Sequence, residues 1–483
     1  MKKLLLYGSI ITSFLSFLVC LFSGDSIGQE YFLVPLYPLL YGVLSLLIWP
    51  YMTDPTRSGR VTAGVFLMLQ WLRCVLLPML GTPAGYFTIE FNLSSESSAI
   101  TAGWLFLYEM FLSFLTVYLI LRFSRRNFQP QIQNLSALRG RTFVYVVFVL
   151  FALVLYLREG SGMYSFFLLE ANAGRVNAAD NNINQIISAL IGFGLTFAVI
   201  LLIYFCFKRY CVTGLSRYVY LALVIALLRI CLISSSSDGR LAVLYPVGAF
   251  MLLLPKLFKR HSRLIIRSIV LFGVIVIGLL TIYKVFHAFT HDSYAEALQS
   301  GMEDFGQTDA ATQINVYFYG VQNIAKNIFV ADKLQLPMGK ILEDLLRNTF
   351  GVHYLLKDSS QTTVALYNLY IYEGRQASGH LFSSLAYGYT YLGPFLAPFA
   401  TAFNIFVASL VEKLLRKTKY IDTFYIAALI YVRLVYNIFS NFPASWNNAS
   451  RNLILGFIII GGASLLKYKW SASGQTYHKL RST

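Results

Sequence analysis

Apolar runs long enough to cross a bilayer recur from one end of the chain to the other, and they restrict its fold more than any other feature. A helix needs about 20 apolar residues to cross a hydrocarbon core of roughly 30 Å. Backbone groups in lipid must bond to one another, so these runs are helices, whereas a barrel would show short alternating strands. We predict twelve spans: 4–22, 31–50, 61–80, 102–121, 142–157, 185–207, 218–233, 241–255, 268–283, 380–411, 421–439 and 452–466.

Composition agrees with a membrane protein and excludes a chain of soluble domains. Hydrophobic residues make up 57% of the chain and charged residues only 13%, against about 25% charged residues in soluble domains. We therefore expect an all-α polytopic membrane protein, with residues 1–483 as a single integral membrane domain. Residues 1–22 are interpreted as a retained first span; the alternative is a signal peptide, but no clear small-residue cleavage site follows.

The net charge of +17 is explained by topology rather than by nucleic-acid binding. With the N-terminus inside, most of the 39 lysines and arginines fall in the inner segments, as the positive-inside rule requires. This orientation puts both termini on the cytoplasmic side and predicts attraction to anionic membrane lipid, with no nucleic-acid partner.

One outer segment, 284–379 between spans nine and ten, is too long to be a plain connector. Within it, apolar residues recur at helical spacing in two stretches, 313–330 and 341–356. The residues that carry this spacing are Ile314, Phe318, Val321, Ile324, Ile328, Ile341, Leu342, Leu345 and Leu346. We expect amphipathic helices in this large extracytoplasmic loop that lie on the membrane or cap a cavity.

Charged residues inside predicted spans are expensive and therefore functional candidates. The clear cases are Arg73, Glu109, Arg229 and Arg433. For Arg73 and Glu109 the alternative is an internal ion pair that only holds helices together.

The stretch "ISSSSDGRLAVLYPV" interrupts two apolar runs at the predicted outer face. Arg229 lies about one turn before it, and Arg240 follows its serines. Two guanidinium groups there could bind a phosphate bidentately. The alternative is that Arg240 only snorkels at a helix start and that Asp238 is a simple N-cap.

A second cluster, Glu373, Arg375 and His380, lies where the long outer loop enters span ten. A histidine there could act as a general base near neutral pH, or it could serve only as a hydrogen-bonding residue at a helix end. His353 is a weaker candidate. His287 and His291 have a helical metal-ligand spacing without a third ligand, so we expect no metal site and no cofactor.

The five cysteines show neither metal-ligand nor disulfide spacing, and we expect them to be small buried hydrophobic residues. They are Cys20, Cys74, Cys206, Cys211 and Cys231.

With both clusters in view, the layout resembles bacterial Wzy-type polysaccharide polymerases and the related O-antigen ligases. The resemblance is architectural over nearly the whole chain and specific in patches. "SSSSDGRLAV" is similar to the family's stretch in which an arginine, here Arg240, opens a span after a very short outer loop. "HLFSSLAYGYTYLG", from His380, is similar to the ligase pattern of a histidine leading into a helix that ends in a glycine turn, although the family's acid is missing. Arg158 precedes Gly174 by the Arg-x15-Gly spacing of some polymerases.

The resemblance implies a reaction at the outer face of a bacterial cytoplasmic membrane. An undecaprenyl-diphosphate-linked oligosaccharide is the donor, and a sugar hydroxyl of a second repeat unit attacks its anomeric carbon. Arg240 and Arg375 would bind the leaving diphosphate and His380 would be the base. Arg229, Arg158, Asp238 and Glu373 would help to bind substrate. A chain-length regulator and a flippase are the expected protein partners.

Three other classes remain open. A flippase or other secondary transporter fits the number of spans and the charges within them, but predicts short loops. Another type of lipid-carrier glycosyltransferase would show an acidic pair in a large early outer loop, whereas the first outer loop here is only "SGDSIGQE". A membrane acyltransferase would carry a paired-histidine signature, and we find no convincing one.

Overall fold

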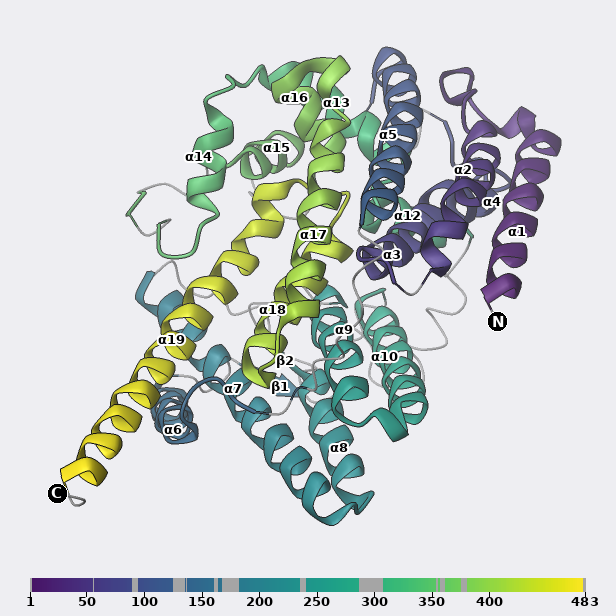
Figure 1. Ribbon diagram of the computed structural model, residues 1–483. Coiled ribbons are helices and arrows are strands. Elements are labelled where there is room, and N and C mark those ends of the chain that lie inside the picture. Colours follow the sequence, from purple (N-terminus) through teal and green to yellow (C-terminus); the bar gives the residue numbers. More distant parts are fainter. Residues whose placement is uncertain are drawn as a thin grey trace, which may run out of the picture. The chain divides into compact units, whose positions relative to one another are not determined.

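The computed structural model describes residues 2–54, 56–88, 94–124, 135, 137–159, 164–166, 182–234, 240–285, 307–352, 355–356, 361–374 and 380–480. Its regular structure is almost entirely helical (Figure 1). The contacts divide the chain into two units. Unit 1 comprises Met1–Gln131, Phe305–Leu414 and Arg433–Asn448, and unit 2 comprises Ile132–Asp304, Leu415–Val432 and Ala449–Thr483.

The first helices of unit 1 are the predicted N-terminal spans. They are α1 (Lys2–Phe22), α2 (Leu36–Thr53), α3 (Arg60–Trp71), α4 (Leu77–Gly81) and α5 (Glu96–Phe123). Helix α2 packs between α1 and α5. A π-helical turn, Leu72–Leu76, joins α3 to α4 within one continuous span. Such turns place an extra residue in the helix and are frequent at functional sites. Here the turn contains Arg73.

The late part of unit 1 folds into four short helices. They are α12 (Gln307–Tyr317), α13 (Val321–Leu334), α14 (Lys340–Arg347) and α15 (Thr363–Ile371). The stretch 313–330 is thus two helices rather than one, because the backbone reverses at Tyr319, whose φ is 57°. Helix α13 packs against α5, α15 and α16 (Figure 1).

For α13, the prediction of a helix lying on the membrane surface is wrong. Its apolar residues Val321, Ile324 and Ile328 are buried, and so are its polar residues Asn323 and Asn327. The helix is covered by α5, α15 and α16, and Asn327 bonds to Tyr367 and Ser383 on these neighbours. Helix α14 keeps the predicted amphipathic character, with its leucines at 342 and 346 exposed to 62% and 39%.

The predicted span 380–411 is a broken helix and not a straight one. Helices α16 (Ser384–Leu396) and α17 (Phe399–Lys417) meet at an angle of 116°. Gly393 takes φ 76°, which L-residues rarely adopt, and Pro394 follows it without a backbone donor. A side chain at Gly388 would collide with the backbone of Ala397, so α16 can fold back closely on the start of α17.

Unit 2 is built mainly from α6 (Thr142–Glu159), α7 (Asn182–Thr213), α8 (Arg217–Cys231), α9 (Arg240–Leu257) and α10 (Ser262–Val285). Consecutive helices in this series pack against one another. Helices α18 (Ile421–Tyr436) and α19 (Phe442–Leu480) complete the chain. Two short strands, β1 (Tyr164–Phe166) and β2 (Leu232–Ser234), pair antiparallel, with Tyr164 opposite Ser234.

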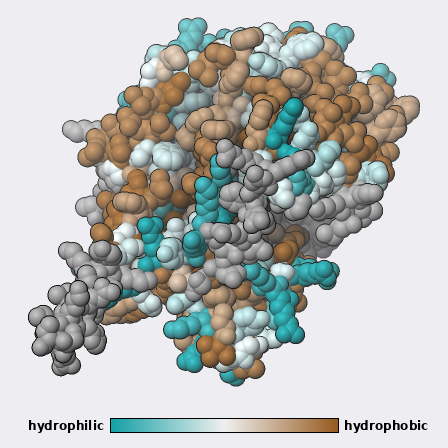
Figure 2. Space-filling model, in the orientation of Figure 1, coloured by the Kyte–Doolittle hydropathy of each residue, from teal (hydrophilic) through white to brown (hydrophobic). Residues whose placement is uncertain are grey.

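Six helices among the described residues are long and apolar enough to cross a membrane, and the number is seven if the bent α16–α17 pair counts as one span. Apolar side chains on such helices face outwards, for example Phe143, Leu150 and Leu157 of α6. Figure 2 shows hydrophobic side chains over much of the visible face. The chain is therefore a helical protein with membrane-spanning character. Each predicted span overlaps a helix, but twelve crossings and an outer loop at 284–379 stay predictions.

Three contacts join segments that the sequence analysis assigns to the same side of the membrane. In unit 1 the buried Glu412 accepts hydrogen bonds from the backbone of Gly59 and Thr62, all from predicted inner ends. At the predicted outer ends, Trp446 donates to Thr349. In unit 2 the two strands pair the predicted outer segments 158–184 and 234–240 at their edges. These contacts are compatible with the sides that the sequence analysis assigns to the segments. Which side is the inner one and which the outer one stays a prediction.

The cysteines are all free, as predicted. Cys20, Cys74 and Cys206 are buried. The prediction of burial is wrong for Cys211, which is exposed in the last turn of α7, just after Lys208 and Arg209, and Cys231 is only half-buried.

Candidate functional site

His380 lies in unit 1 on the short segment between α15 and α16, and its backbone is held by one buried asparagine. The His380 N–H donates to Asn368 Oδ1 at 2.7 Å, and Asn368 Nδ2 donates back to His380 O at 3.2 Å. The Asn368 side chain is fully buried on α15. An asparagine amide carries one acceptor and two donors, so it can pair with a peptide group as a neighbouring strand would.

Two further asparagines hold the residues that follow. Ser383 N–H donates to Asn327 Oδ1 at 2.8 Å, and Asn441 Nδ2 donates to Phe382 O at 2.9 Å. Both amides are buried. We call Asn327, Asn368 and Asn441 the amide clamp. It satisfies the backbone of a non-helical segment that would otherwise have unpaired buried groups.

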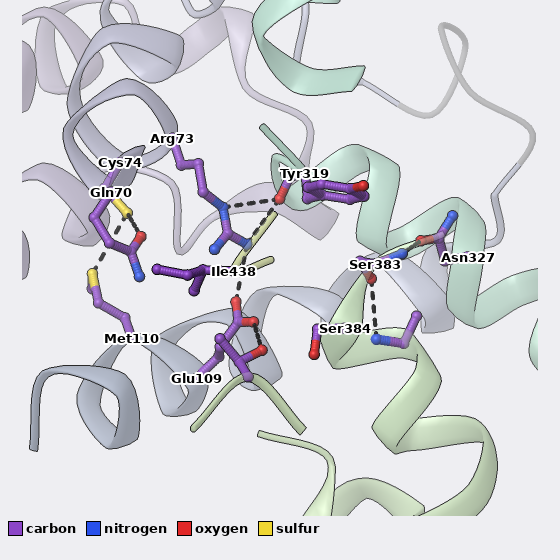
Figure 3. A network of polar contacts seen from close by, with 12 residues as sticks. Gln70, Arg73, Cys74, Glu109, Met110, Tyr319, Asn327, Ser383, Ser384 and Ile438 are labelled. Atoms are coloured by element: carbon purple, nitrogen blue, oxygen red, sulfur yellow. Dashed lines mark hydrogen bonds and ion pairs between the residues drawn. The ribbon is translucent and has the colours of Figure 1, made fainter. Parts of the chain in front are cut away.

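A fourth asparagine extends these contacts to the start of α16. Asn404 Nδ2 lies 3.2 Å from Ser384 Oγ and 2.8 Å from the carbonyl oxygens of both Ile438 and Ser440. Figure 3 shows Asn327 meeting Ser383, with Ser384 nearby. The segment before α16 and the segment after α18 are thus tied into one polar layer.

The His380 side chain is half-buried and lies against Tyr372, with ring centroids 5.2 Å apart and the planes 29° from parallel. Burial, reinforced by the ammonium group of Lys326, lowers the pKa of His380 to about 4. Neither ring nitrogen has a hydrogen-bond partner among the described residues. The imidazole is therefore neutral at physiological pH and one of its nitrogens can accept a proton.

A buried ion pair connects the π-helical turn to α5. Arg73 Nη2 lies 2.9 Å from Glu109 Oε2, and both side chains are 1% exposed. Arg73 also donates twice to the carbonyl oxygen of Tyr319, from Nε at 3.0 Å and from Nη2 at 2.8 Å. Thr401 donates to the other oxygen of Glu109. Figure 3 shows Arg73 pointing toward both Tyr319 and Glu109.

Aromatic rings enclose the same guanidinium group. Its central carbon lies 3.9 Å from the ring centroid of Phe439 and 4.6 Å from that of Phe106. Arg73 Nη1 has no hydrogen-bond partner in the part of the chain that the structure describes. The interpretation of Arg73 and Glu109 as an internal ion pair is confirmed, and this pair holds the reversal at Tyr319 in place.

Another buried acid, Asp344, was not a candidate from its sequence and joins α14 to α15 and α16. Asp344 accepts from the backbone N–H of Thr363 at 3.0 Å, from the Thr363 hydroxyl at 2.5 Å and from Tyr387 OH at 3.1 Å. The Thr363 hydroxyl also contacts Tyr391 OH. Burial raises the pKa of Asp344 even though these donors oppose it. The contacts are structural, because they attach α14 to the helix that follows His380.

In unit 2 the paired strands bring the backbones of two arginine-containing segments together. Arg158 is in the last turn of α6, before β1, and Arg229 is in the last turn of α8, before β2. Arg158 is 80% exposed and pairs with the adjacent Glu159 at 3.2 Å. Arg229 is half-buried and donates to Leu232 O at 3.1 Å. Arg240 begins α9, which follows β2.

The predicted site residues thus divide between the units. His380 and Glu373 belong to unit 1, whereas Arg158, Arg229 and Arg240 belong to unit 2. Glu373 is exposed in a left-handed turn, with φ 52°, after α15. The predictions for Arg375, Asp238, His353, His287 and His291 fall outside the described residues, as does the Arg240 side chain.

Sequence reasoning missed the amide clamp and Lys326. The available signal was the pattern "QNIAKNIF", in which Asn323 and Asn327 recur one turn apart within an otherwise apolar helix. Such polar residues in a buried helix indicate a hydrogen-bonding role. In the part of the chain that the structure describes, no group of three His, Cys, Asp or Glu side chains could hold a metal ion.

Comparisons with protein-family models, with curated proteins and with solved structures find no match to this chain.

Proposed function

We propose that this chain polymerises lipid-diphosphate-linked oligosaccharide repeat units into a cell-surface polysaccharide, at the outer face of a bacterial cytoplasmic membrane. The observation that carries the proposal is His380. Its backbone is fixed by the amide clamp, and its neutral ring makes no hydrogen bond to another residue that the structure describes. A positioned, unprotonated imidazole is what a general base for a sugar hydroxyl requires.

In the proposed reaction, His380 takes the proton of an acceptor hydroxyl as the oxygen attacks the anomeric carbon of the donor. The bond from that carbon to the phosphate oxygen breaks, and the lipid diphosphate leaves with the electron pair. The proton on His380 then passes to the diphosphate or to water. The energy comes from the diphosphate ester, so no nucleotide is consumed.

Arginines would stabilise the leaving diphosphate, because a guanidinium group can donate two parallel hydrogen bonds to phosphate oxygens. Arg240 and Arg375 are the proposed ligands, with Arg229 and Arg158 as further cations and Asp238 and Glu373 as polar neighbours. Support comes from the strand pairing, since β1 and β2 join the segments that contain Arg158, Arg229 and Arg240. The half-buried position of Arg229 suits an arginine that is partly shielded from water.

The test is a reconstituted polymerisation assay. Purified protein in liposomes, given only an undecaprenyl-diphosphate-linked repeat unit, should form a ladder of longer chains without nucleotide sugar or added metal. Ladder formation that stops on addition of a chelator would contradict the arginine-based account. No ladder with a competent repeat unit would overturn the proposal.

A second candidate function is transport of the lipid-linked oligosaccharide. It is favoured by the 116° break between α16 and α17, since transporters commonly build substrate sites from discontinuous helices. The buried pair of Arg73 and Glu109 also fits a protein with charges within its spans. The same liposomes distinguish the two: movement of the lipid-linked sugar across the bilayer without joining of repeats would establish transport.

A further inference from the structure

Lys326 lies on α13 directly before the clamp residue Asn327, beside the segment that carries His380. Asn327 Oδ1 accepts from Ser383 N–H at 2.8 Å, and its Nδ2 lies 3.5 Å from Leu381 O. Asn327 therefore attaches α13 to residues 381–383. The ammonium group of Lys326 is near enough to His380 to act on its charge.

No described carboxylate pairs with Lys326. The nearby helices of unit 1 have acids whose partners are other groups: Asp332 accepts from Tyr389 OH, Asp344 from Thr363, and Glu343 from Lys340 and Arg347. Lys326 is half-buried, and this burial lowers its pKa. A partly desolvated ammonium without a counter-ion among the described residues favours the binding of an anion.

We propose that Lys326 and His380 form a phosphate-binding pair that holds the diphosphate of the lipid-linked donor next to the base. This inference rests on the proposed function for the identity of the ligand. The Lys326 ammonium offers three N–H donors and a compact positive charge, which suits a phosphate. His380 adds a ring nitrogen, and Tyr372 supports the ring from one side.

Placing the diphosphate here would also change the basicity of His380. In the free protein the charge of Lys326 disfavours an imidazolium ion. A bound diphosphate neutralises Lys326 and places negative charge beside the ring, and both changes favour protonation of the imidazole. His380 would thus become a stronger base only when the donor is bound.

The experiment measures binding of two probes, inorganic pyrophosphate and farnesyl diphosphate, to the purified full-length protein, with farnesol as the uncharged control. The variants are Lys326→Met and the matched control Lys333→Met. Lys333 is on the same helix but exposed, with its ammonium 5.7 Å from the ring centroid of Phe329. Loss of one charge-assisted contact should weaken diphosphate binding about 10- to 100-fold in Lys326→Met. Lys333→Met and farnesol binding should be unchanged.

Methionine removes a half-buried charge while keeping the length of the side chain, so Lys326→Met should fold. Lys326→Arg, which keeps the charge, should retain most of the binding. Diphosphate affinity in Lys326→Met equal to wild type would overturn the inference, as would an equal loss in Lys333→Met. Weakened pyrophosphate binding with unchanged farnesyl diphosphate binding would assign the site to free phosphate and overturn the lipid-linked ligand.

The outcomes separate this inference from the proposed function. Diphosphate binding that depends on Lys326, in a protein that forms no polymer, would support the site and reject the polymerase. Polymer formation at the wild-type rate and affinity in Lys326→Met would support the polymerase and reject the site.

Discussion

Arg73 and Glu109 of unit 1 differ in burial from Arg158 and Arg229 of unit 2. In unit 1, Arg73 and Glu109 are almost completely buried, and each has hydrogen-bond partners from distant parts of the chain. In unit 2, Arg158 is exposed, and Arg229 is half-buried at a helix end. A buried charge must be paired for the protein to fold, whereas a charge at a helix end remains available to a ligand. The comparison teaches that Arg73 is a stability residue and that the unit 2 arginines are the better candidates for binding.

The largest effect is expected for Arg73→Met. The substitution leaves Glu109 buried without its cation, which should destabilise the fold by about 3–5 kcal/mol. Thermal unfolding of the purified protein in detergent measures the change. The double variant Arg73→Met/Glu109→Met should recover much of the loss, because neither charge is then buried alone. If Arg73→Met were as stable as wild type, Arg73 would not be a stability residue and would no longer differ from the unit 2 arginines in this respect.

His380→Ala should reduce polymerisation about 10²- to 10⁴-fold, the usual contribution of a general base. The half-buried ring makes no hydrogen bond to another described residue, so the unfolding midpoint should change little. Initial rates of ladder formation give the measurement. Full activity would leave His380 a structural residue and would return the search for the base to other side chains.

Arg240→Ala tests the unit 2 side of the comparison. Removal of a charge-assisted contact to the diphosphate should slow polymerisation about 10- to 100-fold while expression and unfolding stay at wild-type values. Arg158→Ala is the matched control for an exposed arginine of the same unit, and it should have the smaller effect. Normal chain lengths in Arg240→Ala would reject its role at the diphosphate.

Asn368→Ala probes the amide clamp. The backbone N–H and C=O of His380 lose their partners, and each unpaired group costs about 1–3 kcal/mol unless water replaces the amide. The rate of polymerisation should fall strongly, because His380 is no longer held in position, whereas the unfolding midpoint should fall only modestly. The control is Thr390→Val, which removes a hydroxyl bonded only to a carbonyl of its own helix. Loss of stability with an unchanged rate would mean that the clamp does not position His380.

The smallest effect is expected from pH. Since the pKa of His380 is held at about 4, its ring is neutral throughout the range from roughly pH 5.5 to pH 8, and polymerisation should show no step there from this residue. The unfolded histidine titrates at 6.5, so the unfolded state binds more protons between the two values. Stability should therefore be lost as the pH falls from about 6.5 towards 4.

The comparison of wild type with His380→Gln isolates this contribution. As the pH is lowered through that range, the unfolding midpoint of wild type should fall relative to that of His380→Gln. A His380 ring signal that titrates near its ordinary value in nuclear magnetic resonance spectra would contradict the burial argument.

Much of the helical layout could be predicted because it depends on local composition. Each apolar run that the sequence marks as a span overlaps a helix, and Gly393, in the stretch that begins at His380, interrupts the helical backbone within α16. The break between α16 and α17 was not predicted, since the hydropathy of 380–411 is continuous through it. Only the packing of Gly388 against Ala397 shows why the chain folds back there.

The sequence predicts the histidine of the candidate site but not the residues that hold it in place. His380 stands out as an ionisable residue at the edge of an apolar run. Asn368 and Asn327 do not, because asparagines are ordinary loop and helix-end residues, and their value here comes from bonds to a segment 12 and 56 positions away. Lys326 is one more charge of a long loop in the sequence, and only the contacts of its neighbour Asn327 with Leu381 and Ser383 bring α13 to this segment.

The sequence by itself determined that this is a helical membrane protein, where its apolar helices lie, and which charged residues are unusual, because hydropathy, helix length and the cost of isolated charges are local properties. Tertiary structure alone decided that Arg73 is neutralised by Glu109, that α13 is buried rather than on the surface, and that amides hold the His380 segment. These are contacts between residues far apart in the chain. The same residue types could pair equally well with many other partners, and the sequence does not say which pairs form.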